Sequence, residues 1–103
     1  MSSKNPRKPT HPGEFIREEI MPELNMSQGG LARAIGRSRL AINELLLEKR
    51  GVSTDMALRL GRVFGTTPEF WLNMQQARDL WEERQANRKE YERLKPLPVK
   101  QAA

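Results

Sequence analysis

Two arginines flank a serine where a short apolar pattern begins, and this arrangement could bind phosphate. Arg37 and Arg39 lie on either side of Ser38, a residue type that caps the N-terminus of helices. A helix N-terminus has unpaired N–H groups and the positive end of the helix dipole, so it already attracts anions. The guanidinium groups add to that attraction. We therefore expect contacts with phosphate groups at this position.

Two short helices joined by a tight turn would position these side chains. The first is predicted to follow the N-cap Ser27 and to end near Gly36, because glycine tolerates the positive φ of such a turn. The second begins after Ser38. The residues expected to pack at the junction are Leu31, Ile35, Ile42 and Leu45, and those pointing outward from the second helix are Leu40, Asn43, Glu44 and Leu47. This pattern matches a helix-turn-helix, whose second helix places its N-terminal end and outer face in a DNA groove.

Three further helices are predicted around this pair. The first runs from Pro12 to about residue 24, and Pro22 should distort or end it. Another follows Ser53 and ends near Gly65, and the last begins at Thr67 and reaches about residue 93. No segment shows the alternation of a strand. The fold class is therefore all-α with five helices: a flexible basic tail (1–11), the helix-turn-helix domain (12–94) and a C-terminal tail (95–103).

Composition excludes several classes of protein. The chain has 103 residues, a formal net charge of +5, one histidine and no cysteine. Disulfide scaffolds, thiol nucleophiles and thiolate zinc sites are excluded, and we expect no cofactor and no metal. No apolar stretch is long enough for a membrane span or a signal peptide, so we expect a soluble, cytoplasmic protein. Residues 28–51 hold five basic and two acidic side chains, which suits either a solvated face or contact with nucleic acid.

Seven short motifs occur in an order that is typical of one family. The chain resembles the HigA antitoxins, also labelled VapI-like, within the phage-repressor (XRE) group of helix-turn-helix proteins, over about residues 11–82. The motifs are His11-Pro12-Gly13-Glu14, Ser27-Gln28, Leu31-Ala32-Arg33, Ile42-Asn43-Glu44, Lys49-Arg50-Gly51, Ala57-Leu58-Arg59-Leu60 and Thr67-Pro68-Glu69-Phe70-Trp71-Leu72.

The resemblance implies a λ-repressor-like DNA-binding domain in a bacterial protein that is not an enzyme. It implies an antitoxin of a HigB/HigA-type module that neutralises a RelE-like mRNA interferase by direct binding. It also implies that a homodimer binds a palindromic operator in double-stranded DNA and represses its own operon. The alternatives are a free-standing XRE-type regulator without a toxin, and an interaction protein that has lost DNA binding. The resemblance does not indicate which face would bind a toxin; the N-terminal segment and the faces of the first and last helices are all candidates.

The family's roles can be transferred to positions of this chain. The positions that read bases in related repressors are Arg39, Leu40 and Glu44, with Asn43 beside them. The positions that hold phosphates are Gln28, Arg37, Ser38, Lys49 and Arg50. By chemistry, Arg39 suits guanine, Asn43 adenine, Glu44 the cytosine amino group and Leu40 a thymine methyl.

Other residues allow a structural or a functional interpretation. His11 is expected to be structural or to cap a helix, and Phe70, Trp71 and Trp81 to be core or dimer contacts. Gly29-Gly30 either brings backbone N–H groups close to phosphate or frays the helix start. Glu48 replaces a glycine common in the family, which would strain or replace a left-handed cap. The basic N-terminal tail is expected to be a solvated leader rather than a minor-groove arm.

Overall fold

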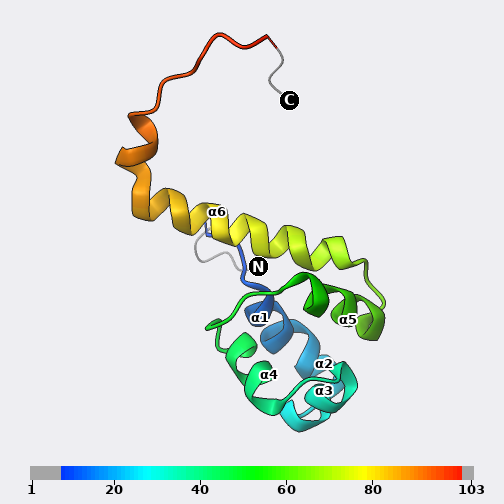
Figure 1. The fold of residues 1–103 in the computed structure, drawn as a ribbon. Helices are drawn as coiled ribbons and strands as arrows, with labels where there is room; N and C mark the ends of the chain where they lie inside the picture. The colour runs from blue at the N-terminus through cyan, green and yellow to red at the C-terminus, as the bar shows by residue number, and fades with distance from the viewer. Residues whose placement is uncertain (1–7, 101–103) are drawn as a thin grey trace.

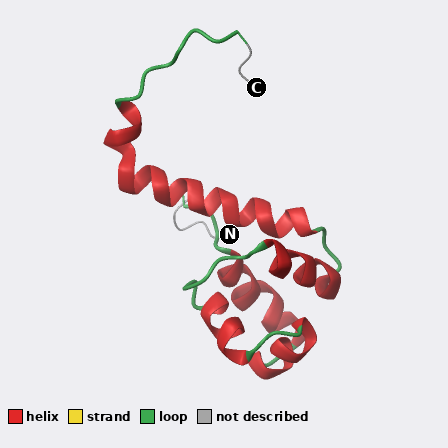
Figure 2. Ribbon diagram, viewed as in Figure 1, coloured by secondary structure: helices red, strands yellow, loops and turns green. Residues whose placement is uncertain are grey.

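The structure is a computed structural model that describes residues 8–100, and within this range it contains helices and no strand, as predicted. Three consecutive segments, α1 (Pro12–Phe15), η1 (Ile16–Ile20) and α2 (Met21–Leu24), follow one another without a break and form the first helix. The others are α3 (Gln28–Ile35), α4 (Arg39–Leu46), α5 (Thr54–Phe64) and α6 (Pro68–Glu92). The described part thus has the five expected helices, all coloured red in Figure 2.

The first helix contains a π-helical segment that the sequence does not predict. In η1 the N–H of Met21 donates to the carbonyl of Ile16, one residue further back than in an α-helix. Pro22 follows directly and has no N–H to continue the α-helical ladder. The wider turn allows the helix to pass through Pro22, which therefore distorts the helix without ending it. The end comes at Asn25, which is left-handed with φ 51°.

Serine caps start the next three helices, as expected from the sequence. The hydroxyl oxygens of Ser27, Ser38 and Ser53 accept from the N–H three residues on, at 3.0, 3.0 and 3.1 Å. Glycines in the left-handed region end two of these helices, at Gly36 (φ 79°) and Gly65 (φ 73°). The tight turn between α3 and α4 is therefore made by local signals.

The long helix α6 packs on the domain with its first half only. Thr67 caps it, and its buried residues are Trp71, Gln75 and Arg78. The helix continues past the domain, bends at Asn87 (φ −126°) and leads to an extended C-terminal segment (Figure 1). This projection accounts for the elongated dimensions of 52 × 29 × 25 Å.

One core lies between α1, η1, α3, α4, α5 and the start of α6. Its fully buried side chains include Ile16, Leu31, Ile42, Leu45 and Trp71. Phe15, Phe64 and Phe70 surround Trp71, with ring centroids 5.0 to 6.0 Å from its ring. The four residues predicted to join the two helices of the helix-turn-helix all belong to this core.

Part of the expected N-terminal tail packs on the domain. His11 is buried, and the carbonyl of Pro9 accepts a hydrogen bond from Arg78 at 3.2 Å. The Nζ of Lys8 lies 5.7 Å from the centre of the Trp81 ring. Residues 1–7, which make up most of the predicted leader, lie outside the described residues. So do residues 101–103, the end of the predicted C-terminal tail. From residue 8 to residue 100, no helix has both the length and the apolar character required to cross a membrane.

Candidate nucleic-acid interface

Helix α4 presents two different faces. Ile42 and Leu45 are fully buried and hold α4 on the core, whereas Leu40 on the other side is 64% exposed. Asn43 and Glu44 are partly exposed beside it. Ridges of apolar side chains on the inner face therefore support the outward face that the sequence predicted.

The N-terminal end of α4 is open and basic. Arg37, Ser38 and Arg39 are all exposed, and the Ser38 hydroxyl satisfies the N–H of Ala41. The other N–H groups of the first turn have no partner within the helix and remain available to an anion. The structure thus brings together the cationic side chains and the dipole end from which phosphate contact was inferred.

A pair of side chains from α5 holds the turn before α4. Asp55 accepts hydrogen bonds from Arg37 and, at 2.9 Å, from Arg59. The bonds from Arg59 and then Arg37 keep the pKa of the Asp55 carboxyl below its ordinary value. Arg59 also donates to the carbonyls of Ile35 and Gly36, at 3.1 and 3.3 Å, at the end of α3. Sequence reasoning did not single out Asp55 or Arg59, although an acid and a base four residues apart on a helix favour such a pair.

Two predicted contact residues bind one another. Arg50 donates twice to one carboxylate oxygen of Glu44, from Nε at 3.1 Å and from Nη2 at 2.7 Å. The bond places a predicted phosphate ligand beside the predicted base-reading residue Glu44. It also offsets the charge of the one acidic side chain on that face, which would otherwise repel DNA.

The start of α3 is ordered. Gln28 begins the helix, the N–H of Gly30 donates to Ser27, and Leu31 donates to the Ser27 carbonyl at 2.9 Å. A Cβ placed on Gly29 would meet nothing closer than an Arg33 side-chain atom at 3.7 Å. The helix start is therefore not frayed, and packing does not require glycine at position 29.

The end of α4 keeps the left-handed cap despite the missing glycine. Glu48 has φ 63°, and the next residue, Lys49, donates to the carbonyl of Glu44 at 2.8 Å. A left-handed non-glycine residue costs about 1 kcal/mol, so surrounding contacts must hold it. Lys49 and Arg50 are exposed directly after it.

Of the predicted core or dimer residues, Trp71 belongs to the core. It is 0% exposed, and its indole N–H donates to Thr66. Of its two expected roles, core or dimer contact, Trp71 therefore takes the core role. Phe70 is 39% exposed, and Trp81 is partly exposed beside Lys8.

His11 caps α1, one of its two expected roles. Its Nδ1 accepts from the N–H of Gly13 at 2.9 Å. Its pKa is lowered, first by burial and also by the nearby charge of Arg78, with Glu48, Glu82 and Asp79 acting in the opposite direction.

No protein-family model matches the chain, but individual relatives do. Virulence-associated protein I from Dichelobacter nodosus is 46% identical over 79 residues, which cover 77% of this chain and 73% of that protein. Antitoxin HigA-1 from Vibrio cholerae is 37% identical over 97 residues, 93% of this chain and 90% of that protein. Among solved structures, the Pseudomonas aeruginosa antitoxin HigA with the higBA promoter aligns with a TM-score of 0.83 and 40% identity, over 89% of this chain and 100% of that one. By sequence over nearly its whole length and by fold, this chain belongs to the HigA antitoxin family of helix-turn-helix proteins.

Proposed function

We propose that this chain is the antitoxin of a HigB/HigA-type module, that it represses its own operon by binding operator DNA as a homodimer, and that it neutralises a RelE-like toxin by direct binding. The observation that carries the proposal is the open, basic N-terminal end of α4 in a chain 40% identical to a HigA solved with promoter DNA. Such an end fits the major groove, which accepts one helix.

Base reading is assigned to the outward face of α4. Arg39 can donate two hydrogen bonds to guanine O6 and N7, and Leu40 can touch a thymine methyl. Asn43 can pair with adenine one turn further along. Glu44 would accept from a cytosine amino group while Arg50 remains bound to it, because only one of its carboxylate oxygens is used by Arg50.

Phosphate contacts are assigned to both ends of α4 and to the start of α3. Arg37 and Ser38 lie before α4, Lys49 and Arg50 lie after it, and Gln28 begins α3. Contacts of this kind fix the position of the protein on the duplex without reading its sequence. They also make binding salt-dependent.

The test of DNA binding uses the duplex immediately upstream of this chain's gene and a scrambled duplex of equal length and composition. Specific repression predicts binding to the upstream duplex about 10³-fold or more tighter than to the scrambled one. Equal affinities would contradict autorepression.

Dimerisation through α6 would place two copies of α4 about 34 to 36 Å apart, one turn of DNA. The partly exposed Phe70 and Trp81 are candidate contacts on that helix. Trp81→Glu should then give monomers in sedimentation. Leu97→Glu, at a residue that is 76% exposed in the C-terminal segment, is the matched control and should leave the dimer intact. A dimer that survives Trp81→Glu would move the interface elsewhere.

Toxin neutralisation requires a surface outside the α4 face. The first helix carries Glu14, Glu18, Glu19 and Glu23 against a single basic residue, Arg17, so its charge suits a basic partner. The test is to co-express the chain with the short reading frame beside its gene. Antitoxin function predicts that the neighbour arrests growth alone, and that co-expression restores growth and co-purifies both chains. If the neighbour is harmless and unbound while the upstream duplex is bound, the chain is a free-standing regulator.

A further inference from the structure

The loop that follows α4 is fixed at both ends by side chains of α6. This loop, residues 47–53, carries Lys49 and Arg50, which are assigned to phosphate above. Two of the three buried polar side chains in the described part of the chain, Gln75 and Arg78, lie one turn apart on α6 and reach this loop. Because α6 is distant in sequence from α4 and from the loop, no local pattern explains the arrangement.

Gln75 holds the end of the loop. Its side-chain oxygen accepts from the N–H of Val52 at 2.9 Å, and its amide nitrogen donates to Asp79 at 2.9 Å. The loop passes so close that a Cβ on Gly51 would lie 2.9 Å from the Gln75 side chain. The backbone just after Arg50 therefore has no freedom to move toward α6.

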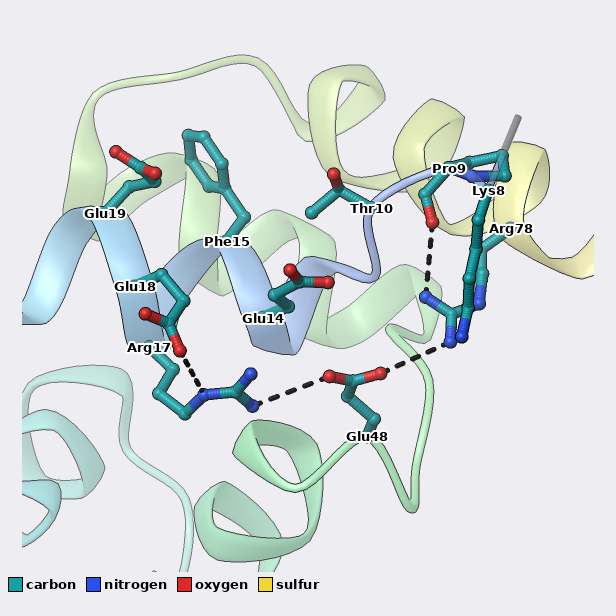
Figure 3. A pocket seen from close by; sticks show the side chains of 10 residues that line it. All are labelled: Lys8, Pro9, Thr10, Glu14, Phe15, Arg17, Glu18, Glu19, Glu48 and Arg78. Carbon is teal, nitrogen blue, oxygen red and sulfur yellow. Dashed lines mark hydrogen bonds and ion pairs between the residues drawn. The ribbon is translucent and has the colours of Figure 1, made fainter. Parts of the chain in front are cut away.

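Glu48 holds the start of the loop. One of its carboxylate oxygens lies 3.3 Å from Arg78 Nη2, and the other lies 3.5 Å from Arg17 Nη1 (Figure 3). Arg78 is itself fixed, since it donates to the carbonyl of Pro9 and, at 2.8 Å, to Glu82. This ion bridge offsets the left-handed strain at Glu48 and ties the loop to α6 and to the first helix.

This ion network is only partly buried, because the side chain of Arg78 is 8% exposed but those of Glu48 and Arg17 are 26% and 38% exposed, and such a network is a weak source of stability. Removing charges from water costs about as much as their attraction returns, so an apolar cluster would stabilise the domain as well or better. What the network supplies is a fixed geometry. Lys49, Arg50 and Gly51 lie between the fixed points Glu48 and Val52, and the first two of these are exposed and cationic.

We propose that Glu48, Gln75 and Arg78 are positioning residues for DNA binding: they hold the loop so that Lys49 and Arg50 meet the phosphates while α4 lies in the groove. The acidic Glu48 then strengthens DNA binding although its own charge opposes it. The inference rests on the proposed DNA-binding function and adds to it a role for α6.

Glu48→Gln separates positioning from simple charge. The variant makes the loop more positive, so electrostatics alone predicts tighter binding to any duplex. Positioning predicts the opposite. The salt slope, which is the slope of the logarithm of the binding constant against the logarithm of the salt concentration, falls in magnitude by about one unit for each phosphate that the loop no longer binds. Each lost phosphate contact weakens binding about eightfold at ~0.1 M salt. Glu90→Gln is the matched control, because it makes the same charge change at a side chain that is 70% exposed far along α6. It should leave the slope unchanged.

Gly51→Ala is a second variant that changes no charge. Its methyl group would lie 2.9 Å from the Gln75 side chain and must push Gln75 away from Val52, while the charges of Glu48 and Arg78 both remain. We expect the same reduction of the salt slope with helical circular dichroism unchanged. This variant decides the question even where Glu48→Gln fails to fold.

The variants Glu48→Gln and Arg78→Gln also form a double-mutant cycle. If the two residues act through one another, their effects do not add. The double variant then binds DNA as well as whichever single variant binds it less tightly, or better. If they act only as charges, the single effects have opposite signs and the double variant binds like the wild type. Binding by Glu48→Gln or Gly51→Ala that is unchanged or tighter overturns the proposal. The salt slopes are readable on scrambled duplex as well, so failure of specific repression and failure of this inference are distinguishable.

Discussion

The two ends of α4 are held by different means. At the N-terminal end, Ser38 caps the helix and the flanking arginines remain exposed. At the C-terminal end, Leu45 and Leu46 are buried, and a carbonyl of the helix lies directly against Gly13 of α1. One eight-residue helix is thus anchored at its end and open at its beginning.

This difference shows how a short helix can serve as a binding element. An isolated helix of this length is not stable in water, so its order must come from tertiary packing. The structure concentrates that packing at the C-terminal end and on the inner face. The N–H groups and guanidinium groups at the other end are then preorganised without being covered, which lowers the ordering cost of binding.

The largest expected effect comes from crowding the anchored end. A Cβ on Gly13 would lie 1.8 Å from the carbonyl oxygen of Leu45, and both are backbone positions that cannot rotate away. Gly13→Ala must push α1 and α4 apart, and we expect a loss of about 3 kcal/mol in the free energy of unfolding. Urea denaturation measures it.

Gly29→Ala is the control for this prediction, since Gly29 has the same position in α3 that Gly13 has in α1. There the new methyl group meets only side-chain atoms, at 3.7 Å or more. We expect unchanged or slightly higher stability, because alanine favours a helix by up to about 1 kcal/mol over glycine. Equal effects of the two substitutions would show that the α1–α4 contact does not anchor the helix.

At the open end, Arg39→Ala should change binding and leave the fold intact. The side chain is exposed, so the melting temperature should stay the same. We expect a loss of about 1 to 3 kcal/mol in operator binding, confined to the correct sequence. Titration of operator and scrambled duplexes measures it, with Arg93→Ala as the control that removes an equal charge from the exposed C-cap position just after α6. Equal losses on both duplexes would reduce Arg39 to a phosphate contact.

The open end could be predicted from the sequence because its signals are local. Ser27, Gly36 and Ser38 lie within a few residues of the helix ends that they cap, and each does what its residue type favours. The outward face of α4 follows from the spacing of its apolar residues in the same way.

The anchored end could not be predicted because its contacts are distant in sequence. The carbonyl of Leu45 meets Gly13 of α1, and Gln75 of α6 reaches Val52 in the loop that follows α4. The apolar residues of α6 also suggest the wrong inward face, since Phe70 and Leu80 are exposed while Gln75 and Arg78 are buried. The spacing of Trp71, Gln75 and Arg78 was the signal that could have shown the inward face. It places the two polar residues on the same side of the helix as Trp71, a large apolar residue that favours burial.

Ser38→Ala tests the cap at the open end. Losing the bond from Ser38 to the N–H of Ala41 should cost about 1 kcal/mol in the free energy of unfolding. Operator binding should weaken as well, because the first turn of α4 would no longer be fixed. Ser38→Asn restores a cap and should recover both quantities in the same denaturation and titration experiments. A variant that keeps full operator affinity would show that the cap is not needed for the first turn to bind DNA.

The smallest expected effect is a pH dependence at the anchored end. Burial lowers the pKa of His11, so the folded state favours the neutral imidazole whose Nδ1 accepts from Gly13. In the unfolded state the His11 pKa has its ordinary value near 6.5, so below that pH the unfolded state binds more protons than the folded state. The contribution of His11 to stability is therefore fully present above about pH 6.5 and is lost as the pH falls toward the lowered pKa of the folded state. His11→Asn keeps a capping oxygen that does not titrate, so its melting temperature should fall less between pH 7 and pH 5 than that of the wild type. The caps of α3 and α4 are serines, which do not titrate in this range, so acid should loosen the Gly13 contact while Ser38 still holds the start of α4. If the melting temperatures of the two proteins fall equally between pH 7 and pH 5, His11 does not contribute to this pH dependence.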